Sequence, residues 1–472
     1  MASVLFIHKV WYESLGLMQL SAILKRKGHK TYLYMDNGNY SRLIHLMSKL
    51  KPDIVGFSLM TGQHLWALKT AEVLKNKLNE IKPLIVFGGP HPTFTPEIIE
   101  KDPVDIICRG EGEGALLNLM DSIDNKNDFS NIPNLWVKKN SKVIKNDLRP
   151  LIDNLDSLPF PDRDLFYQYS YFCDDPNKMV MASRGCPFNC SFCFNRKYKE
   201  LYNTELKVVR RRSCKNVIDE IKLLKSKYRK TKFIKFHDDI FSLDRDWLCN
   251  FLETYEKEIK LPFVCYIRAG IDNEEIIKRL SKAGCICVTF GIETGDEKLR
   301  YLLLNKKVSN YQIYNTAQLL KKYKIKFYTN SIFFIPETNL SEAWETVKIN
   351  QKIKPDYIVS NIFQAYPGTA LSEYLLEKKM IKSNYLETMK DIYSFPIDKT
   401  NNTNIEINIY YFFFLLVKLP WLTPIIKQLV KCRPNILFLL IFKVTSGIDY
   451  WFRRNLSFIR FLREVYHNHN YK

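Results

Sequence analysis

The chain has 472 residues, of which 46% are hydrophobic and 26% are charged. This composition excludes a disordered protein, and the length allows two to four folded domains. A net charge of +21 would suit a polyanionic partner. However, no basic run accompanies a recognisable nucleic-acid-binding module, so we expect no nucleic acid partner.

The N-terminal residues lack the basic segment, apolar run and cleavage site of an export signal. Eleven cysteines, an odd number, are spread through the chain. In a chain without an export signal, this usage predicts reduced thiols, with metal binding wherever cysteines cluster. We therefore expect a cytoplasmic protein.

Residues 1–130 alternate short β-rich runs with segments of helical period. The runs predict five strands, at 3–9, 31–35, 53–58, 84–89 and 104–110. Strands that alternate with helices predict an α/β fold with a doubly wound parallel sheet. Such sheets bind ligands in the loops at the carboxyl ends of their strands, so we expect a ligand site at that edge.

After the polar stretch "DNKNDFSN" at 124–131, residues 131–175 contain "LDSLPFPDRDLF", whose prolines disfavour regular structure and predict a linker. A second alternating series occupies residues 176–375. Its predicted strands are 179–183, 232–237, 263–268, 285–291, 326–334 and 357–363. Six βα units predict a partial barrel, with chemistry at the carboxyl ends of its strands.

Residues 376–472 include a segment dense in aromatic and aliphatic residues that is interrupted by lysines, an arginine and prolines. No charge-free run reaches the roughly 18 to 20 residues that cross a bilayer. The segment predicts helices that cap the site, or helices whose apolar face enters a membrane surface while basic residues meet headgroups. The two interpretations can coexist, and the second would make the protein membrane-associated.

The stretch "SRGCPFNCSFC", residues 183–193, places Cys186, Cys190 and Cys193 on the loop after the first strand of the second series. Thiolates are soft ligands that bind zinc, copper(I) or iron–sulfur clusters. A structural zinc takes four protein ligands, and no fourth cysteine or histidine lies nearby. A 4Fe-4S cluster held by three thiolates leaves one iron open, as catalytic metal sites do. The loop therefore predicts such a cluster.

This loop resembles the hallmark of the radical S-adenosylmethionine (SAM) superfamily, Cys-x-x-x-Cys-x-aromatic-Cys, with Phe192 at the aromatic position. The resemblance implies that SAM chelates the open iron, that Phe192 packs near its adenine, and that SAM is cleaved to a 5'-deoxyadenosyl radical. It also implies an electron donor such as a ferredoxin or flavodoxin. "FHDDIF", "GIETGDEKL", "FIPET" and "AYPGTAL" occur in the order seen in the branch with an N-terminal cobalamin-binding domain.

Three carboxylates at predicted strand ends would face the barrel mouth: Asp238, Asp239 and Glu293. The resemblance implies that they contact SAM, through its ribose hydroxyls or its ammonium group. Helix N-capping is the alternative, above all for Asp238. The fifth-strand segment around Pro336 departs from the usual Gly-x-Pro-Gly-Glu-Thr, so this loop need not share the geometry of the family.

Before such a barrel, the N-terminal domain resembles a cobalamin-binding domain. "KPDIVGFSLMT", "FGGPHPTFTPE" and "ICRGEGE" are similar to its third, fourth and fifth strand ends. Glycines there would let the backbone approach the corrin or its nucleotide tail, and polar side chains would hydrogen-bond the tail. The candidate cobalamin-binding residues are Ser58, Thr61, Gly88, Gly89, Thr93 and Glu111.

The Asp-x-His-x-x-Gly element, by which many corrinoid enzymes place a histidine on cobalt, is missing, so we expect no protein histidine ligand. The resemblance implies a methyltransferase that acts on an unactivated carbon of a small or lipid-like substrate. An oxidative cyclase similar to the anaerobic magnesium-protoporphyrin enzyme and a non-catalytic corrinoid protein are the alternatives. A methylthiotransferase is disfavoured, because Cys108 is the only cysteine before residue 173 and that family carries an additional N-terminal trio.

Overall fold

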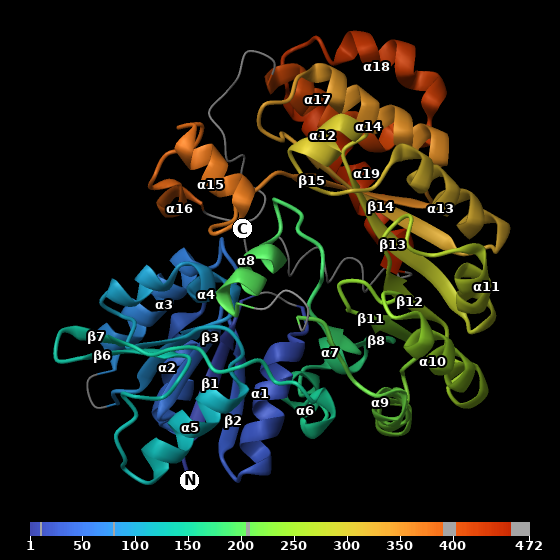
Figure 1. Cartoon of the computed structure of the whole chain (residues 1–472). Helices are drawn as coiled ribbons and strands as arrows, with labels where there is room; N and C mark the ends of the chain where they lie inside the picture. The colour runs from blue at the N-terminus through green and yellow to red at the C-terminus, as the bar shows by residue number, and fades with distance from the viewer. Residues whose placement is uncertain (10–11, 79–80, 204–207, 390–402, 455–472) are drawn as a thin grey trace.

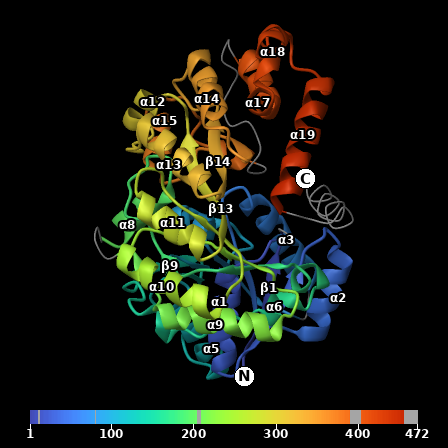
Figure 2. The same ribbon diagram turned by 90° about the vertical axis from the view of Figure 1, so that its right-hand side faces the viewer.

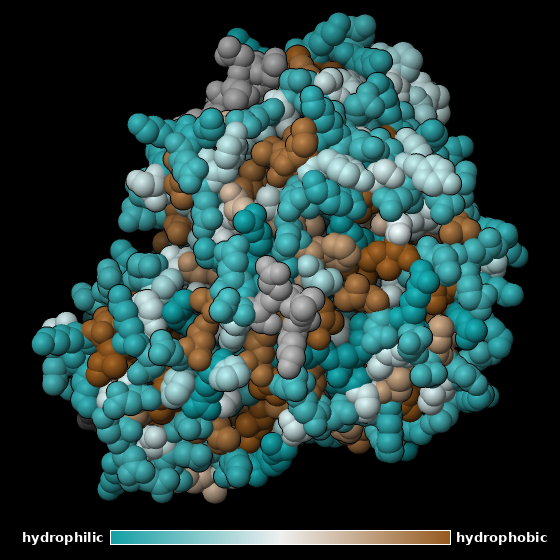
Figure 3. All heavy atoms as spheres, in the orientation of Figure 1, coloured by the Kyte–Doolittle hydropathy of each residue, from teal (hydrophilic) through white to brown (hydrophobic). Residues whose placement is uncertain are grey.

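The computed structural model describes residues 1–9, 12–78, 81–203, 208–389 and 403–454. Two α/β bodies lie side by side, and the helices of residues 403–454 pack on the second (Figure 1). In the sphere view, apolar side chains come to the surface in the middle of the molecule, and the outer rims are mostly hydrophilic (Figure 3).

The N-terminal sheet has the strand order β2-β1-β3-β4-β5-β6-β7. Its five parallel strands are β1 (Ser3–His8), β2 (Lys30–Met35), β3 (Ile54–Ser58), β4 (Leu84–Gly88) and β5 (Ile106–Cys108). Between them lie α1 (Leu15–Arg26), α2 (Tyr40–Leu50), α3 (His64–Lys77), α4 (Pro90–Phe94), η1 (Pro96–Glu100) and, after β5, α5 (Glu113–Asp124). The predicted doubly wound α/β sheet is confirmed.

Helices cover both faces of this sheet because its strands are apolar on both sides. Val4 and Phe6 of β1 belong to the core that contains α1 and α5, whereas Leu5 and Ile7 belong to the core that contains α2 and α3. Successive side chains of a strand point to opposite faces, so one continuous apolar run serves both layers.

The sheet has two more strands than predicted, and the predicted linker is corrected over its first part. Residues of that segment form the hairpin β6 (Leu135–Lys139) and β7 (Lys142–Lys145), which pairs antiparallel with β5. Asn140 and Ser141 at its turn have positive φ values, as a tight hairpin turn requires. The remainder of the segment contains η2 (Leu155–Ser157), α6 (Asp164–Tyr167) and α7 (Ser170–Cys173).

The second body is built on a six-stranded parallel sheet in the order β15-β14-β13-β12-β11-β8, which confirms the predicted partial barrel. The strands are β8 (Asn177–Val180), β11 (Phe233–Phe236), β12 (Phe263–Tyr266), β13 (Cys285–Glu293), β14 (Lys326–Phe333) and β15 (Tyr357–Ile362). The helices are α9 (Cys214–Lys227), α10 (Arg245–Glu258), α11 (Glu274–Lys282), α12 (Glu297–Leu302), α13 (Asn310–Lys322) and α14 (Leu340–Ile353).

The first barrel strand ends earlier than predicted, at Val180, because Ser183 belongs to a separate short strand. This strand, β9 (Ser183–Arg184), pairs antiparallel with β10 (Arg210–Arg211). The helix α8 (Phe194–Leu201) follows the three cysteines.

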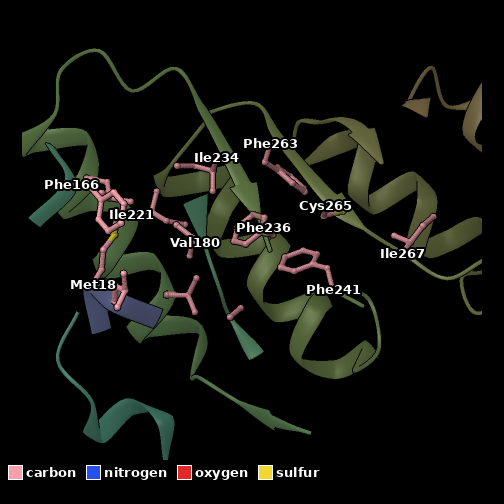
Figure 4. Close-up of a cluster of buried hydrophobic side chains, with 14 of the residues drawn as sticks. Met18, Phe166, Val180, Ile221, Ile234, Phe236, Phe241, Phe263, Cys265 and Ile267 are labelled. Carbon is pink, nitrogen blue, oxygen red and sulfur yellow. The ribbon is translucent and has the colours of Figure 1, made fainter. Parts of the chain in front are cut away.

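One hydrophobic core continues from the N-terminal body into the barrel. Met18 of α1 and Phe166 of α6 belong to the same buried cluster as the barrel residues Phe236, Phe241 and Phe263 (Figure 4). Rings in this cluster stack closely, with 4.3 Å between the centroids of Phe236 and Phe241. The two bodies therefore meet across a packed core, which holds their strand ends in a defined relation.

The C-terminal region consists of α15 (Ala370–Glu377), α16 (Tyr385–Thr388), α17 (Thr403–Lys418), η3 (Pro420–Leu422), α18 (Thr423–Leu429) and α19 (Ile436–Arg454). Side chains of α17 and α19 share a core with α14 and with Ile358 of β15, so this bundle packs at the edge of the barrel sheet. Among the described residues, none of the helices has the length and apolar character needed to span a bilayer.

Candidate active site

The three predicted cluster ligands lie between β9 and α8. Cys193 is the N-cap residue of α8, and its backbone N–H donates to the carbonyl of Cys190 at 3.1 Å. Ser191 anchors the loop, because its N–H donates to the carbonyl of Leu304 at 3.0 Å and its carbonyl accepts from the N–H of Leu371 at 2.9 Å. The loop is therefore held by the segment after α12 and by α15.

Two of the three thiols are buried enough that their protonated form is favoured in the protein without a metal. Burial raises the pKa of Cys186 to about 11 and that of Cys193 to about 12, and the neighbouring thiols add to both shifts. A bound cluster supplies the positive charge that turns such thiols into thiolates. Within the described parts of the chain, no three Cys, His, Asp or Glu side chains converge as ligands of a single ion. Three thiolates that each bind a different iron need no such convergence.

Arg268 is a cationic neighbour of this loop that the sequence did not single out. It follows β12, and its Nη1 lies 3.9 Å from Sγ of Cys190. Its guanidinium carbon lies 3.9 Å from the ring centroid of Phe188, and Nη2 donates to the carbonyl of Lys307 at 3.4 Å. The sequence signal that could have identified Arg268 is a cationic residue at the end of a predicted barrel strand. Its charge would balance that of thiolates bound to a cluster.

The two adjacent aspartates have different surroundings. Asp238 is buried, and its carboxylate accepts hydrogen bonds from the N–H of Ala182 and the hydroxyl of Ser183, so it fixes the start of the cluster loop. N-capping is not its role, because the N-cap of α10 is Asp244. Asp239 accepts a hydrogen bond from the side chain of Asn195, and burial raises its pKa.

Asp239 also influences the pKa of Cys186 and Cys193, which places its carboxyl beside the cluster loop. Of the two aspartates, it is the one whose surroundings agree better with the predicted contact to SAM. That contact stays a prediction for both residues.

Glu293 ends β13 in a left-handed conformation, with φ 65°. Its Oε1 lies 2.6 Å from Nζ of Lys306, which also donates to the carbonyl of Gly291 at 2.7 Å. A left-handed conformation is unfavourable for a residue with a side chain, and such strain is typical of functional sites. The predicted contact with SAM would therefore involve a carboxylate that is already paired with a lysine.

The segment that departs from the family motif also has an unusual backbone. Phe334 and Glu337 are left-handed, with φ 59° and 60°. The N–H of Phe334 donates to Oε1 of Glu406, on α17, at 2.8 Å. The C-terminal bundle therefore supports this barrel loop directly.

Phe192 is half-buried and packs against a small apolar cluster. The cluster includes Leu304, Ile335 and Leu371, so α15 and two loops after barrel strands enclose this side chain. Its predicted place beside the adenine of SAM stays a prediction.

A cavity of about 450 Å³ opens between the carboxyl edge of the N-terminal sheet and the start of the cluster loop. Three parts of the chain form its walls. The N-terminal body contributes, among others, Gly16, Gly56, Ser58, Gly88, Gly89, Cys108 and Glu111. The linker contributes Leu155, Leu158, Pro159 and Pro161. The barrel contributes Met181, Ser183, Arg184, Tyr198 and Arg212.

The cavity fits part of a cobalamin. Its walls are largely apolar and are rich in glycine on the side of the sheet, which suits close contact with a flat group. Gly89 has φ +90°, and a Cβ there would lie 2.8 Å from the backbone nitrogen of Leu59, so only glycine is accommodated. Cobalamin is much larger than the cavity. The cavity would therefore hold only a part of the cofactor.

Four of the six predicted cobalamin residues line this cavity, namely Ser58, Gly88, Gly89 and Glu111. Thr61 and Thr93 do not line the cavity, so their contact with cobalamin stays a prediction. The hydroxyl of Thr61 lies 3.2 Å from Nδ1 of His91, and that of Thr93 donates to the carbonyl of Gly89 at 2.8 Å. Both hydroxyls are thus used inside the N-terminal body.

Glu111 joins the two bodies instead of offering a free carboxylate. Its Oε1 lies 2.9 Å from Nη1 of Arg184 and 2.9 Å from Nη1 of Arg210, and Oε2 accepts from the N–H of Ile152 at 2.8 Å. Arg184 also pairs with Glu113 at 2.7 Å. Although burial opposes them, the two arginines hold the pKa of Glu111 below its usual value. Glu111 therefore lines the cavity with a carboxylate that is held in place by ion pairs.

The fold and these sites define the chain as a radical SAM enzyme with a corrinoid-binding domain. Residues 180–349 match the family model of the Radical SAM superfamily, and residues 9–120 match that of the B12 binding domain. The chain belongs to the cobalamin-binding branch of the radical SAM superfamily. Its cofactors are a 4Fe-4S cluster, SAM and cobalamin, and it requires a reductant and a substrate.

Relatives include both methyltransferases and cyclases. The "Uncharacterized methyltransferase PH0819" of Pyrococcus horikoshii is 31% identical over 78% of this chain and 79% of its own length. The anaerobic magnesium-protoporphyrin IX monomethyl ester cyclase of Rubrivivax gelatinosus is 28% identical over 76% of this chain and 65% of its own. The radical SAM methyltransferase TsrM of Kitasatospora setae, solved with cobalamin and a [4Fe-4S] cluster, shares the fold with a TM-score of 0.65. It is 16% identical and covers 80% of this chain and 78% of its own.

Proposed function

We propose that this chain is a cobalamin-dependent radical C-methyltransferase that acts on an unactivated carbon of a small or lipid-like substrate. The proposal rests on the observation that the cluster loop begins at the wall of the cavity. Ser183 and Arg184 line the cavity, and Cys186 lies two residues after Arg184. A methyl donor and a radical source must reach the same substrate atom, so their binding sites must adjoin.

When bound, the cofactors supply a 5'-deoxyadenosyl radical and a transferable methyl group. The chain's own residues hold them and keep water out. Cys186, Cys190 and Cys193 would hold the cluster, and Arg268 would balance its charge. Phe192 and α15 cover the loop on one side, which limits water access to a reactive intermediate.

The two walls of the site keep their spacing through buried polar contacts. Asp238 holds Ala182 and Ser183 in place, and Glu111 ties the N-terminal body to Arg184 and Arg210. Such pre-organised contacts position cofactors before reaction and cost no rearrangement during it. We expect a ferredoxin or flavodoxin to deliver the electron.

The name of the P. horikoshii relative supports methyl transfer. The cyclase relative of R. gelatinosus supports a second candidate, oxidative ring formation. The two functions differ in their use of SAM, because only a methyltransferase converts one SAM molecule to S-adenosylhomocysteine.

The test is anaerobic reconstitution with iron, sulfide and cobalamin, followed by reduction in the presence of SAM with a deuterated methyl group. We expect both 5'-deoxyadenosine and S-adenosylhomocysteine, measured by mass spectrometry. Formation of 5'-deoxyadenosine alone would favour the cyclase. If material with a full cluster formed neither product, both the methyltransferase and the cyclase function would be contradicted.

A further inference from the structure

The outer side of the C-terminal bundle carries a concentrated apolar surface, here called the α18–α19 surface. Half of the large apolar side chains that are exposed in the described parts of the chain lie within residues 419–448. They are Leu419, Trp421, Ile425, Leu429, Ile436, Leu437, Leu440, Val444 and Ile448. Trp421 is 70% exposed and Ile436 is 69% exposed. An apolar patch of this density marks an interaction site.

The helix α19 is apolar on two opposite sides. Its inner side packs into the bundle, where the ring of Phe438 lies 4.8 Å from that of Phe412 and Asp449 accepts from the N–H of Ile358 at 3.3 Å. Its outer side presents apolar residues at helical spacing from Ile436 to Ile448. Because the inner contacts fix the helix, the outer stripe does not serve the fold and needs a partner of its own.

The charges on this surface have one sign. Lys427, Lys431, Arg433 and Lys443 are all exposed, and no aspartate or glutamate occurs between residues 419 and 448. The whole chain has 50 acidic residues among 472, so a stretch of thirty without one is unusual. An apolar stripe flanked by cations only is complementary to a surface with an apolar interior and anionic headgroups.

We propose that the α18–α19 surface docks the protein on an anionic lipid bilayer, with the outer sides of α18 and α19 in the plane of the interface. Trp421 would sit at headgroup depth, as tryptophan does at membrane interfaces, while the basic side chains reach the phosphates. Figure 2 shows α18 and α19 along the outer edge of the molecule, on the side away from α9, α10 and α11. This position leaves the surface open to a flat partner.

A substrate lid would require the same residues to face the barrel mouth, and the buried contacts of α19 exclude that for its outer stripe. Docking would also bring the substrate site to the membrane, because Glu406 of α17, in the same bundle, supports the barrel loop at Phe334. The docking proposal stands without the proposed function, since vesicle binding needs no turnover.

The test is flotation of the full chain with two kinds of vesicle, pure phosphatidylcholine and phosphatidylcholine with 30% phosphatidylglycerol. We expect binding to the anionic vesicles that weakens with salt. The charge variant Lys427→Glu/Lys431→Glu/Arg433→Glu should bind at least about a hundredfold more weakly, because each basic residue near the surface contributes about fivefold. The apolar variant Trp421→Ser/Ile436→Ser/Leu440→Ser should lose at least about tenfold.

Matched controls change the same chemistry elsewhere. Lys69→Glu/Lys126→Glu/Lys142→Glu alters three exposed lysines of the N-terminal body, and Leu223→Ser/Ile286→Ser/Tyr311→Ser removes three exposed apolar side chains of the barrel. Both controls should bind as the unchanged chain does. Failure of the unchanged chain to float would overturn the proposal, and so would equal loss in the controls. The proposal would also be overturned if the unchanged chain formed a dimer and the variant Trp421→Ser/Ile436→Ser/Leu440→Ser did not. The surface would then be a self-association interface.

Discussion

The guanidinium of Arg268 lies 3.9 Å from Sγ of Cys190, although 78 residues separate them in the chain. The same group stacks on the ring of Phe188, two residues before Cys190. Stacking fixes the orientation of the guanidinium, so its charge stays beside the cluster loop. A fixed cation there would stabilise the reduced form of a bound cluster, which carries one more negative charge than the oxidised form.

Replacement of Arg268 by methionine should therefore lower the reduction potential of the cluster. Loss of one nearby charge at the edge of a partly buried site is worth about 1 to 2 kcal/mol, or roughly 50 to 100 mV. Potentiometric titration followed by electron paramagnetic resonance measures the shift. Arg268→Lys keeps the charge and should retain most of the potential, whereas an unchanged potential in Arg268→Met would refute the electrostatic role.

Replacement of Cys193 by alanine should abolish cluster assembly and 5'-deoxyadenosine formation. Two thiolates cannot hold a cluster that needs three. Iron and sulfide content after reconstitution, together with product analysis, check the prediction. The control is Cys432→Ala at an exposed cysteine, which should retain full iron content. Equal iron in both variants would mean that Cys193 is not a ligand.

Replacement of Glu111 by glutamine should destabilise the contact between the two bodies and weaken cobalamin retention. The substitution leaves Arg184 and Arg210 without their shared anion in a largely buried setting, at a cost of about 2 to 4 kcal/mol. Thermal unfolding and gel filtration with cobalamin measure the two effects. Glu200→Gln, which removes an exposed pair with Arg196, should have almost no effect.

Replacement of Gly88 by valine should block the cavity without unfolding the sheet. A Cβ at Gly88 meets its nearest neighbours at 3.8 Å or more, so the added group extends without a backbone clash. We expect cobalamin affinity to fall at least about tenfold while the thermal midpoint changes little. Gly89→Ala should behave differently and destabilise the protein, since its Cβ would clash with the backbone at Leu59. Undiminished cobalamin binding by Gly88→Val would show that the cavity is not the site.

The buried histidine His91 makes stability depend on pH. Its ring stacks on His64 with 4.2 Å between centroids, and burial together with the repulsion from His64 lowers its pKa to about 3. In the unfolded chain the pKa is near 6.5, so below that pH only the unfolded chain takes up the proton. The contribution of His91 to stability is therefore complete above about pH 6.5 and declines as the pH falls toward 3.

We expect the free energy of unfolding of the unchanged chain, relative to His91→Asn, to fall by about 1.4 kcal/mol for each pH unit below 6.5. Urea denaturation at pH 7.5, 6.5 and 5.5 measures the difference between the two proteins. A difference that does not change with pH would show that His91 does not stay neutral in the folded state.

The strands and the cluster loop could be predicted from sequence because their signals are local. The composition of a β-rich run such as residues 326–334 is enough to predict a strand there. The spacing of Cys186, Cys190 and Cys193 is likewise visible within eight positions. The hairpin β6–β7 was missed because its strands are short, lysine-rich and set between polar turns. Its pairing with β5 depends on a neighbour that is distant in the chain.

The sequence by itself determined the order of the two α/β bodies, the three-cysteine motif and the cofactor class, since each follows from residues close together in the chain. Only the tertiary structure decided which polar side chains remain available at the site. Thr61, Asp238 and Glu111 all occur at the expected strand ends, but distant segments engage their polar atoms. A buried polar group takes whichever partner the fold brings within about 3 Å, and no local pattern records that partner.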